Sequence, residues 1–89
     1  MQGSRHFELR VERIPVAGVL VGQTLKTAAI REQFGAMVVG LDHPTAGVTI
    51  NPDPDLILQS GQSLVAIGTF GQLEALRRLV VVDTASGAE

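Results

Sequence analysis

The chain has 89 residues, of which 45% are hydrophobic and 18% charged, and its formal net charge is −2. This length suits one small domain, and the hydrophobic share is too high for a disordered tail. The net negative charge and the scarcity of aromatic residues, three phenylalanines, argue against a nucleic-acid partner. With no cysteine and two histidines, thiol chemistry and three-histidine metal centres are excluded, so we expect no catalytic residue and no bound metal.

No segment approaches the roughly 18 consecutive apolar residues of a membrane helix, and the N-terminus lacks the apolar centre of a signal peptide. We therefore expect a cytoplasmic domain without direct membrane insertion. Residues 1–5 are interpreted as an N-terminal extension, 6–80 as the domain and 81–89 as a tail. Because a core of this size stabilises a fold only marginally, the chain is expected to form a homodimer or larger homo-oligomer.

Polar and apolar residues alternate over residues 6–13, which predicts a half-buried strand with Phe7, Leu9 and Val11 on its covered side. Pro15 lacks a ladder donor and is expected to end this strand. The glycine-rich aliphatic segment that follows is predicted to be a connecting loop, and exposed aliphatic segments commonly mark association surfaces. The candidate dimer contacts in it are Val16, Val19, Leu20 and Val21.

Thr24 is suited to cap a helix over residues 25–34. The apolar positions of this segment do not stay on one face, so the helix is predicted to be short or broken near Ala29. Gly35 follows as the left-handed residue that ends it. The next segment, residues 36–42, alternates apolar side chains on both faces and is predicted to be a central strand.

The turn composition of residues 43–47 predicts a hairpin that joins the central strand to a strand at Val48 and Ile50. Two prolines make residues 51–55 a rigid, exposed loop. Residues 56–58 are expected to return to the core, and residues 64–67 form a short buried strand.

Thr69 and Gln72 have the spacing of a capping box, and Phe70, Leu73, Leu76 and Val80 follow at helical intervals. A second helix is therefore predicted, with Arg77 and Arg78 as solvated cations near its C-terminal end. The whole order is β-α-β-β-β-α, which predicts an α+β fold in which one sheet is covered by two helices.

A polar cluster lies on the hairpin and the proline loop. Residues 51–55 mimic the start of a calcium-binding loop, but Leu56 stands where the sharp turn needs glycine and Gln62 where the bidentate glutamate belongs. Asp42 and His43 are neighbours on one strand and therefore point to opposite faces, which disfavours an acid–base pair. A solvated acidic turn is the simplest interpretation, with a looser cation site as the alternative. The cluster comprises Asp42, His43, Asn51, Asp53 and Asp55.

Five spaced segments carry a resemblance to a known family: Gly22–Leu25, Arg31–Gly35, Asn51–Asp55, Leu58–Leu64 and Ile67–Leu73. From about Phe7 to Leu79 the sequence resembles the TrkA-C, or RCK C-terminal, domain. The resemblance implies a β-α-β-β-β-α unit that forms a homodimer. It also implies attachment to a Rossmann-type domain that regulates a prokaryotic potassium channel, potassium transporter or cation/proton antiporter.

Some members of that family bind a small regulatory ligand at the dimer cleft, cyclic di-AMP being the best known. This sequence departs from the family at Asp42 and His43, where a basic residue is common. An aspartate would repel phosphate, and a histidine is cationic only in mildly acidic solution. The ligand-binding residues that the resemblance implies are Leu41, Asp42, His43, Val48, Ile50, Asn51 and Pro52.

The sequence therefore predicts a non-catalytic regulatory module whose dimer changes geometry when a ligand binds. The alternative is a purely structural assembly domain of a membrane transport protein. A third hypothesis, a small hydrolase or isomerase that uses Asp42 and His43, rests only on the general ability of small α+β folds to host chemistry.

Overall fold

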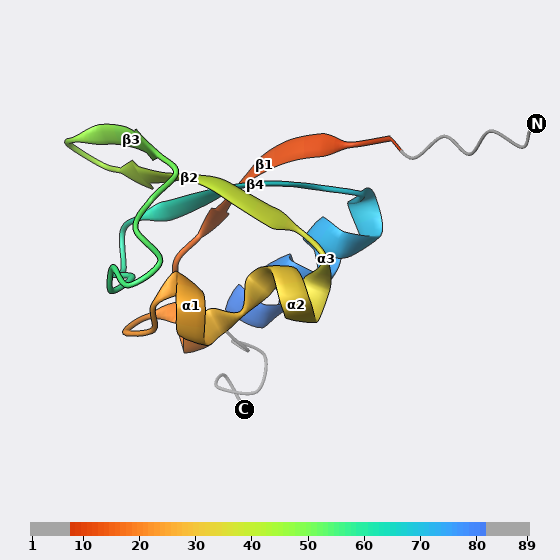
Figure 1. The fold of residues 1–89 in the computed structure, drawn as a ribbon, viewed down its shortest axis with the longest axis horizontal. Helices are drawn as coiled ribbons and strands as arrows, with labels where there is room; N and C mark the ends of the chain where they lie inside the picture. The colour runs from red at the N-terminus through yellow and green to blue at the C-terminus, as the bar shows by residue number, and fades with distance from the viewer. Residues whose placement is uncertain (1–7, 82–89) are drawn as a thin grey trace, which may run out of the picture.

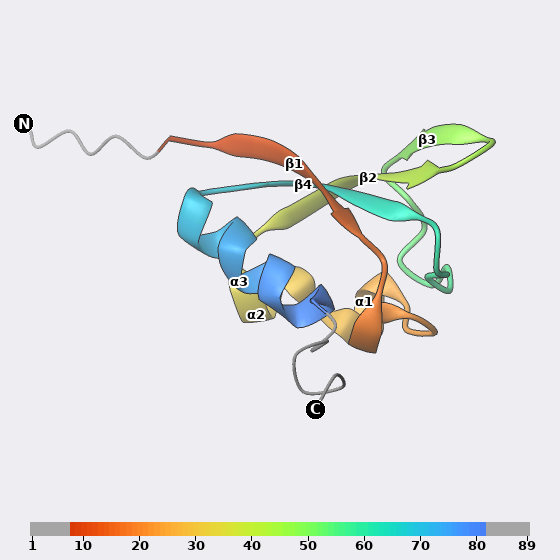
Figure 2. The ribbon, with the colours of Figure 1, turned by 180° about the vertical axis from the view of Figure 1, so that it is seen from behind.

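The computed structural model describes residues 8–81. The four strands form one antiparallel sheet in the order β1-β4-β2-β3. All the helices lie on one side of this sheet (Figures 1 and 2). The α+β fold predicted from the pattern is confirmed. The elements are β1 (Arg10–Pro15), the 3-10 helix η1 (Gly18–Leu20), α1 (Leu25–Ala28), α2 (Ile30–Phe34), β2 (Met37–His43), β3 (Gly47–Ile50), β4 (Ser63–Gly68) and α3 (Phe70–Val80).

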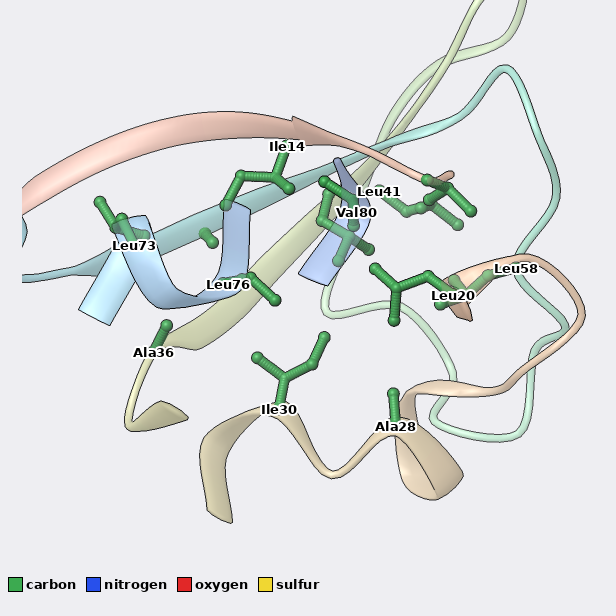
Figure 3. Packing of buried hydrophobic residues seen from close by; sticks show 13 residues of the cluster. Ile14, Leu20, Ala28, Ile30, Ala36, Leu41, Leu58, Leu73, Leu76 and Val80 are labelled. Atoms are coloured by element: carbon green, nitrogen blue, oxygen red, sulfur yellow. The ribbon is translucent and has the colours of Figure 1, made fainter. Parts of the chain in front are cut away.

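The core fills the space between the sheet and the helices, and Figure 3 shows its aliphatic side chains converging there. Strands, helices and loops all contribute, and burying each large aliphatic side chain stabilises the fold by about 1.5–3 kcal/mol. The largest fully buried side chains are Ile14, Val16, Leu20, Leu41, Leu58, Leu64, Leu73 and Leu76.

The predicted break in the first helix is confirmed. Ala29 separates α1 from α2 and has left-handed backbone angles, with φ 49° and ψ 47°. Its neighbours Ala28 and Ile30 are both buried, at 4% and 3% exposure. In a continuous helix two such residues would lie roughly 200° apart around the axis. The break therefore allows both side chains to face the core, as Figure 3 shows.

The capping box that opens α3 is confirmed. The Thr69 hydroxyl accepts a hydrogen bond from the backbone N–H of Gln72 at 3.3 Å, and Gln72 Oε1 accepts one from the Thr69 N–H at 2.9 Å. Phe70, which was grouped with the buried face, is 58% exposed. The guanidinium of Arg10 lies 5.2 Å from the centre of its ring, where a cation–π contact covers part of it.

The covered side of β1 was predicted wrongly. Val11 and Leu9 are 63% and 65% exposed, whereas Ile14, on the other face, is fully buried. Phe7 lies outside the described residues. Alternation predicts that a strand has two unlike faces, but the helices here pack against the face that carries Glu12 and Ile14, whereas Arg13 shares the other face with Val11.

On the helix-covered face of β1, the charge of Glu12 is neutralised by a partner on α3. Its carboxylate forms an ion pair with Arg77 of α3, and both side chains are partly buried. Arg77 is therefore a strand-to-helix contact and not the freely solvated cation that its position in the last turn predicted.

Three residues after the proline loop were expected to return to the core, but only one of them does so. Leu58 is fully buried, but Leu56 and Ile57 are 39% and 56% exposed. The Leu58 N–H donates to the carbonyl of Gln23 at 2.7 Å, and its carbonyl accepts from the Gly22 N–H at 2.8 Å. These two bonds fix Leu58 against the chain that leads into α1, and the two preceding side chains are left outside.

Candidate functional site

The end of the β2–β3 hairpin is shaped by a bulge and a left-handed residue. The pairing of β2 with β4 shifts register between Val38 and Gly40, so Val39 is the extra residue. The Asn51 N–H donates to the Val39 carbonyl at 3.0 Å, and Asn51 has a φ of 51°. Asparagine tolerates this conformation better than most residues. The chain thereby turns away from the sheet, and the next residue, Pro52, is buried.

The proline loop is held by its own hydrogen bonds. Asp53 Oδ1 accepts from the Asp55 N–H at 2.9 Å, and the Asp53 carbonyl accepts from the Leu56 N–H at 3.0 Å. The Pro54 carbonyl accepts from the Lys26 N–H in the first turn of α1 at 3.0 Å. The Asp53 carboxylate therefore closes a turn, and the loop is anchored to α1 through an N–H that the helix itself leaves free.

A pocket of about 280 Å³ lies where this loop meets α1, α2 and the start of β2. Its surface is mostly apolar, and the side chains of Arg31 and Glu32 add one charge of each sign. A cavity of this size and polarity accepts one ring-sized apolar group, and the guanidinium is available to a bound anion. The lining residues are Leu25, Ile30, Arg31, Glu32, Met37, Val38, Pro52 and Pro54.

The ligand-binding residues implied by the resemblance are spread over several environments. Only Pro52 lines the pocket. Leu41 is fully buried in the core, so its side chain is not accessible to a ligand in this structure. Val48 and Ile50 are 45% and 68% exposed on the edge strand β3. Asn51 adjoins the pocket residue Pro52 in the chain.

Asp42 and His43, at the end of β2, each lie close to a different side chain. Asp42 Oδ2 lies 2.7 Å from Arg13 Nη1, and the Asp42 side chain is 20% exposed. Nδ1 of His43 lies 3.4 Å from Nε2 of Gln62, a buried amide whose Oε1 accepts from the Gln59 N–H at 2.9 Å. The two side chains thus have different partners, as expected of neighbours on one strand.

The predicted dimer contacts require a correction. Val16 and Leu20 are 2% and 0% exposed and belong to the core. Val19 and Val21 are 55% and 45% exposed and remain accessible. The segment is partly buried and partly exposed because η1 turns the chain back beneath the sheet. The spacing of the glycines did not predict this turn.

Most of the residues that line the pocket were not predicted from the sequence. Its walls come from three separate segments, residues 25–32, 37–38 and 52–54. No local spacing links these segments, although Arg31 and Pro52 both fall in segments that carry the family resemblance. Within residues 8–81 no three histidine, aspartate or glutamate side chains are grouped as metal ligands, and no helix is long and apolar enough to span a membrane.

An antiparallel sheet in the order β1-β4-β2-β3, helices on one face and a small pocket at the sheet's edge define a small α+β domain with one candidate ligand pocket among the described residues. The TrkA-C domain pattern matches residues 9–81, and the chain belongs to this family. The chain is also 36% identical over 61 residues to potassium channel protein 1 of Methanocaldococcus jannaschii, covering 68% of this chain and 18% of the channel protein.

Two solved structures share the fold. The RCK C domain of the potassium transport protein KtrA, in complex with cyclic di-AMP, superposes with a TM-score of 0.74 at 22% identity, covering 80% of this chain and 82% of that one. The RCK_C domain dimer of Streptococcus agalactiae BusR with cyclic di-AMP has a TM-score of 0.73 at 16% identity, covering 86% and 96%. A longer BusR chain was solved with promoter DNA. The absence of a nucleic-acid partner therefore stays a prediction for this chain.

Proposed function

We propose that this chain is a non-catalytic regulatory domain that binds a small ligand as a homodimer and controls a potassium channel, potassium transporter or cation/proton antiporter. The observation that carries the proposal is the TrkA-C match over residues 9–81. The chain spans less than a fifth of the channel protein that it resembles. The rest of the assembly in the proposal is a Rossmann-type domain and a membrane pore, with this domain on the cytoplasmic side.

The pocket beside the proline loop is the ligand site of this proposal. Its volume of about 280 Å³ fits one nucleobase-sized group rather than a whole dinucleotide. A symmetrical ligand would therefore bridge two copies, with one base in each pocket. Cyclic di-AMP is the first candidate, since two domains with this fold were solved with it. In each copy Arg31 lies at the pocket and Asn51 beside it, where a phosphate and a base edge can be bound.

The charge of Asp42 is less of an obstacle than the sequence indicated. An unpaired aspartate near the site would repel a phosphate, but this carboxylate is paired with Arg13 at 2.7 Å. The pair carries no net charge. Arg31 then supplies the cation that an anionic ligand would contact, and Glu32 lines the same pocket with the opposite charge.

The mechanism is a shift between two dimer geometries. A ligand that touches both copies binds one geometry better than the other, and it changes their ratio only by that difference in affinity. Coupling of about 1–3 kcal/mol corresponds to roughly 5- to 150-fold. The shift is passed to the attached domains, and no bond is made or broken in this domain.

Isothermal titration calorimetry tests the ligand, with cyclic di-AMP, cyclic di-GMP, NAD and divalent cations titrated over about pH 5 to 8. We expect saturable binding of cyclic di-AMP at one ligand per two chains. Arg31→Ala is expected to weaken it about tenfold, which is the loss of one exposed charge-assisted contact of about 1.4 kcal/mol. Arg78→Ala is the matched control, because it removes the same charge from an exposed helix position that does not line the pocket.

Asn51 is tested with glycine, since alanine would strain the left-handed backbone at φ 51°. Asn51→Gly removes the amide and keeps the turn, and weaker binding with unchanged unfolding assigns the amide to the ligand. Flat isotherms for every compound would refute ligand control and leave the structural assembly role.

A further inference from the structure

The pocket lies across the break between α1 and α2. Part of its lining comes from Leu25 of α1 and from the proline loop, and the rest comes from residues 30–32 of α2 and the start of β2. Figure 1 shows the two short helices as separate turns of the chain. The single residue between them is Ala29, with its left-handed backbone. The shape of the pocket therefore depends on how the two helices are held relative to each other.

The first side of the pocket is α1 together with the loop that follows β3. The Lys26 N–H of α1 donates to the Pro54 carbonyl at 3.0 Å. Just before the helix, the Gln23 carbonyl accepts a hydrogen bond from the Leu58 N–H at 2.7 Å. These backbone hydrogen bonds connect α1 to the proline loop and to the segment after it, so the helix and the loop form one unit.

The second side of the pocket is α2, which packs against β2 and α3. Its first residue, Ile30, is 3% exposed and lies in the core. The helix ends at Gly35, whose backbone lies against the Gln72 side chain that caps α3. The two sides of the pocket thus belong to different parts of the fold, which meet at the break.

A side chain replaces a backbone hydrogen bond that the break removes. In a continuous helix the carbonyls of residues 26–28 would accept from the N–H groups of residues 30–32. Among the hydrogen bonds of residues 8–81 none joins these backbone groups. Instead, Nε2 of Gln33 donates to the Ala28 carbonyl at 2.8 Å, and this bond is partly buried. The amide of Gln33 therefore links α2 to the last residue of α1.

We propose that Gln33 is a positioning residue for the ligand, because its amide holds the two sides of the pocket in the arrangement that the ligand binds. The proposal rests on the proposed function. Gln33 itself does not line the pocket, whereas Leu25 and Arg31, on either side of the break, do. A ligand that contacts both helices binds with an affinity reduced by the fraction of chains in which they are not held together. Removal of the Gln33 amide lowers the fraction of chains that can bind.

Hydrogen exchange followed by NMR tests the link between the helices without any ligand. Gln33→Met nearly keeps the length of the side chain and removes its donor. The backbone amides of Ala29 and Gln33, which bond across the break region, are expected to exchange about fivefold faster or more in this variant. The amide of Leu73 in α3 is expected to exchange as in the unchanged chain, which separates local opening from unfolding of the whole domain.

Isothermal titration calorimetry with cyclic di-AMP tests the effect on the ligand. Gln33→Met is expected to weaken binding about threefold or more. Gln23→Met is the matched control, because Nε2 of Gln23 also donates to a backbone carbonyl, that of Val19, but this bond lies outside the pocket. The control is expected to bind cyclic di-AMP as the unchanged chain does. Circular dichroism verifies that both variants fold.

Three results would overturn the role of Gln33. Unchanged affinity of Gln33→Met shows that the amide does not position the ligand, and the proposed function stands. Equal weakening by Gln33→Met and Gln23→Met assigns the effect to general stability, and the proposed function again stands. If the unchanged chain does not bind cyclic di-AMP, the proposed ligand and the positioning role both fail, while the exchange rates still decide whether Gln33 holds the two helices together.

Discussion

Gly35 and Gln72 form a contact between two elements at the scale of single residues. Gly35 ends α2 with a φ of 81°, and a Cβ there would lie 2.6 Å from Nε2 of Gln72. Oε1 of the same Gln72 amide accepts a hydrogen bond from the Thr69 N–H at the start of α3. One glycine therefore gives room for the side chain that caps the next helix.

We expect Gly35→Ala to lower the free energy of unfolding by about 2 kcal/mol, from left-handed strain and a displaced cap. Urea denaturation measures it. Gly71→Ala is the control, because nothing lies within 4 Å of the added methyl group and Gly71 has no positive φ. It should leave stability unchanged or raise it by up to about 1 kcal/mol. Equal losses in both variants would contradict the packing described for Gln72.

At the scale of elements, we expect a substitution between α1 and α2 to raise the free energy of unfolding, whereas Gly35→Ala lowers it. Ala29 has a left-handed backbone, which is unfavourable for alanine by about 1 kcal/mol and open to glycine. Ala29→Gly is therefore expected to raise the unfolding free energy by about 0.5 kcal/mol, after the entropy of the unfolded glycine is subtracted. Thermal unfolding followed by circular dichroism measures the change.

The neighbouring Ala28→Gly serves as the reference for that measurement. Ala28 is helical and 4% exposed, so glycine there should lower stability by about 1 kcal/mol or more. If glycine lowers stability equally at both positions, the helix is continuous in solution and the break at Ala29 is wrong.

The elements that could be predicted from the sequence are those with a local signal. The capping box at Thr69, the glycine at position 35 and the interrupted apolar pattern at Ala29 each depend on residues within one or two turns. The covered side of β1 depends on where α3 packs, more than fifty residues later, as the pair of Glu12 with Arg77 shows. Alternation alone could not decide it.

The candidate site was less predictable than the fold for the same reason. Pro52 was identified through the family resemblance, but the helix residues that complete the pocket, such as Leu25 and Arg31, come from a different part of the chain. Leu41 was assigned to the ligand because it lies in the right segment, yet its side chain points into the core. Segment membership does not determine which way a strand residue points.

At the scale of the whole molecule, the proposed homodimer should make stability depend on protein concentration. For a dimer that unfolds to two chains, each tenfold rise in concentration adds about 1.4 kcal/mol per dimer. This corresponds to an increase of roughly 3 °C in the unfolding midpoint for a chain of this size. Scanning calorimetry at several concentrations measures the slope. A midpoint that does not move for the unchanged chain would show that it melts as a monomer.

Met37 belongs to two surfaces at once, since it lines the pocket and its strand register places it on the side of the sheet that the helices leave uncovered. Its flexible thioether side chain can take several rotamers, but only one at a time. A ligand in the pocket that selects one Met37 rotamer therefore also selects the side-chain surface that the sheet would present to a second copy in the proposed dimer. If the ligand raises the affinity between the two copies of the proposed dimer by some factor, dimerisation must raise the affinity for the ligand by the same factor.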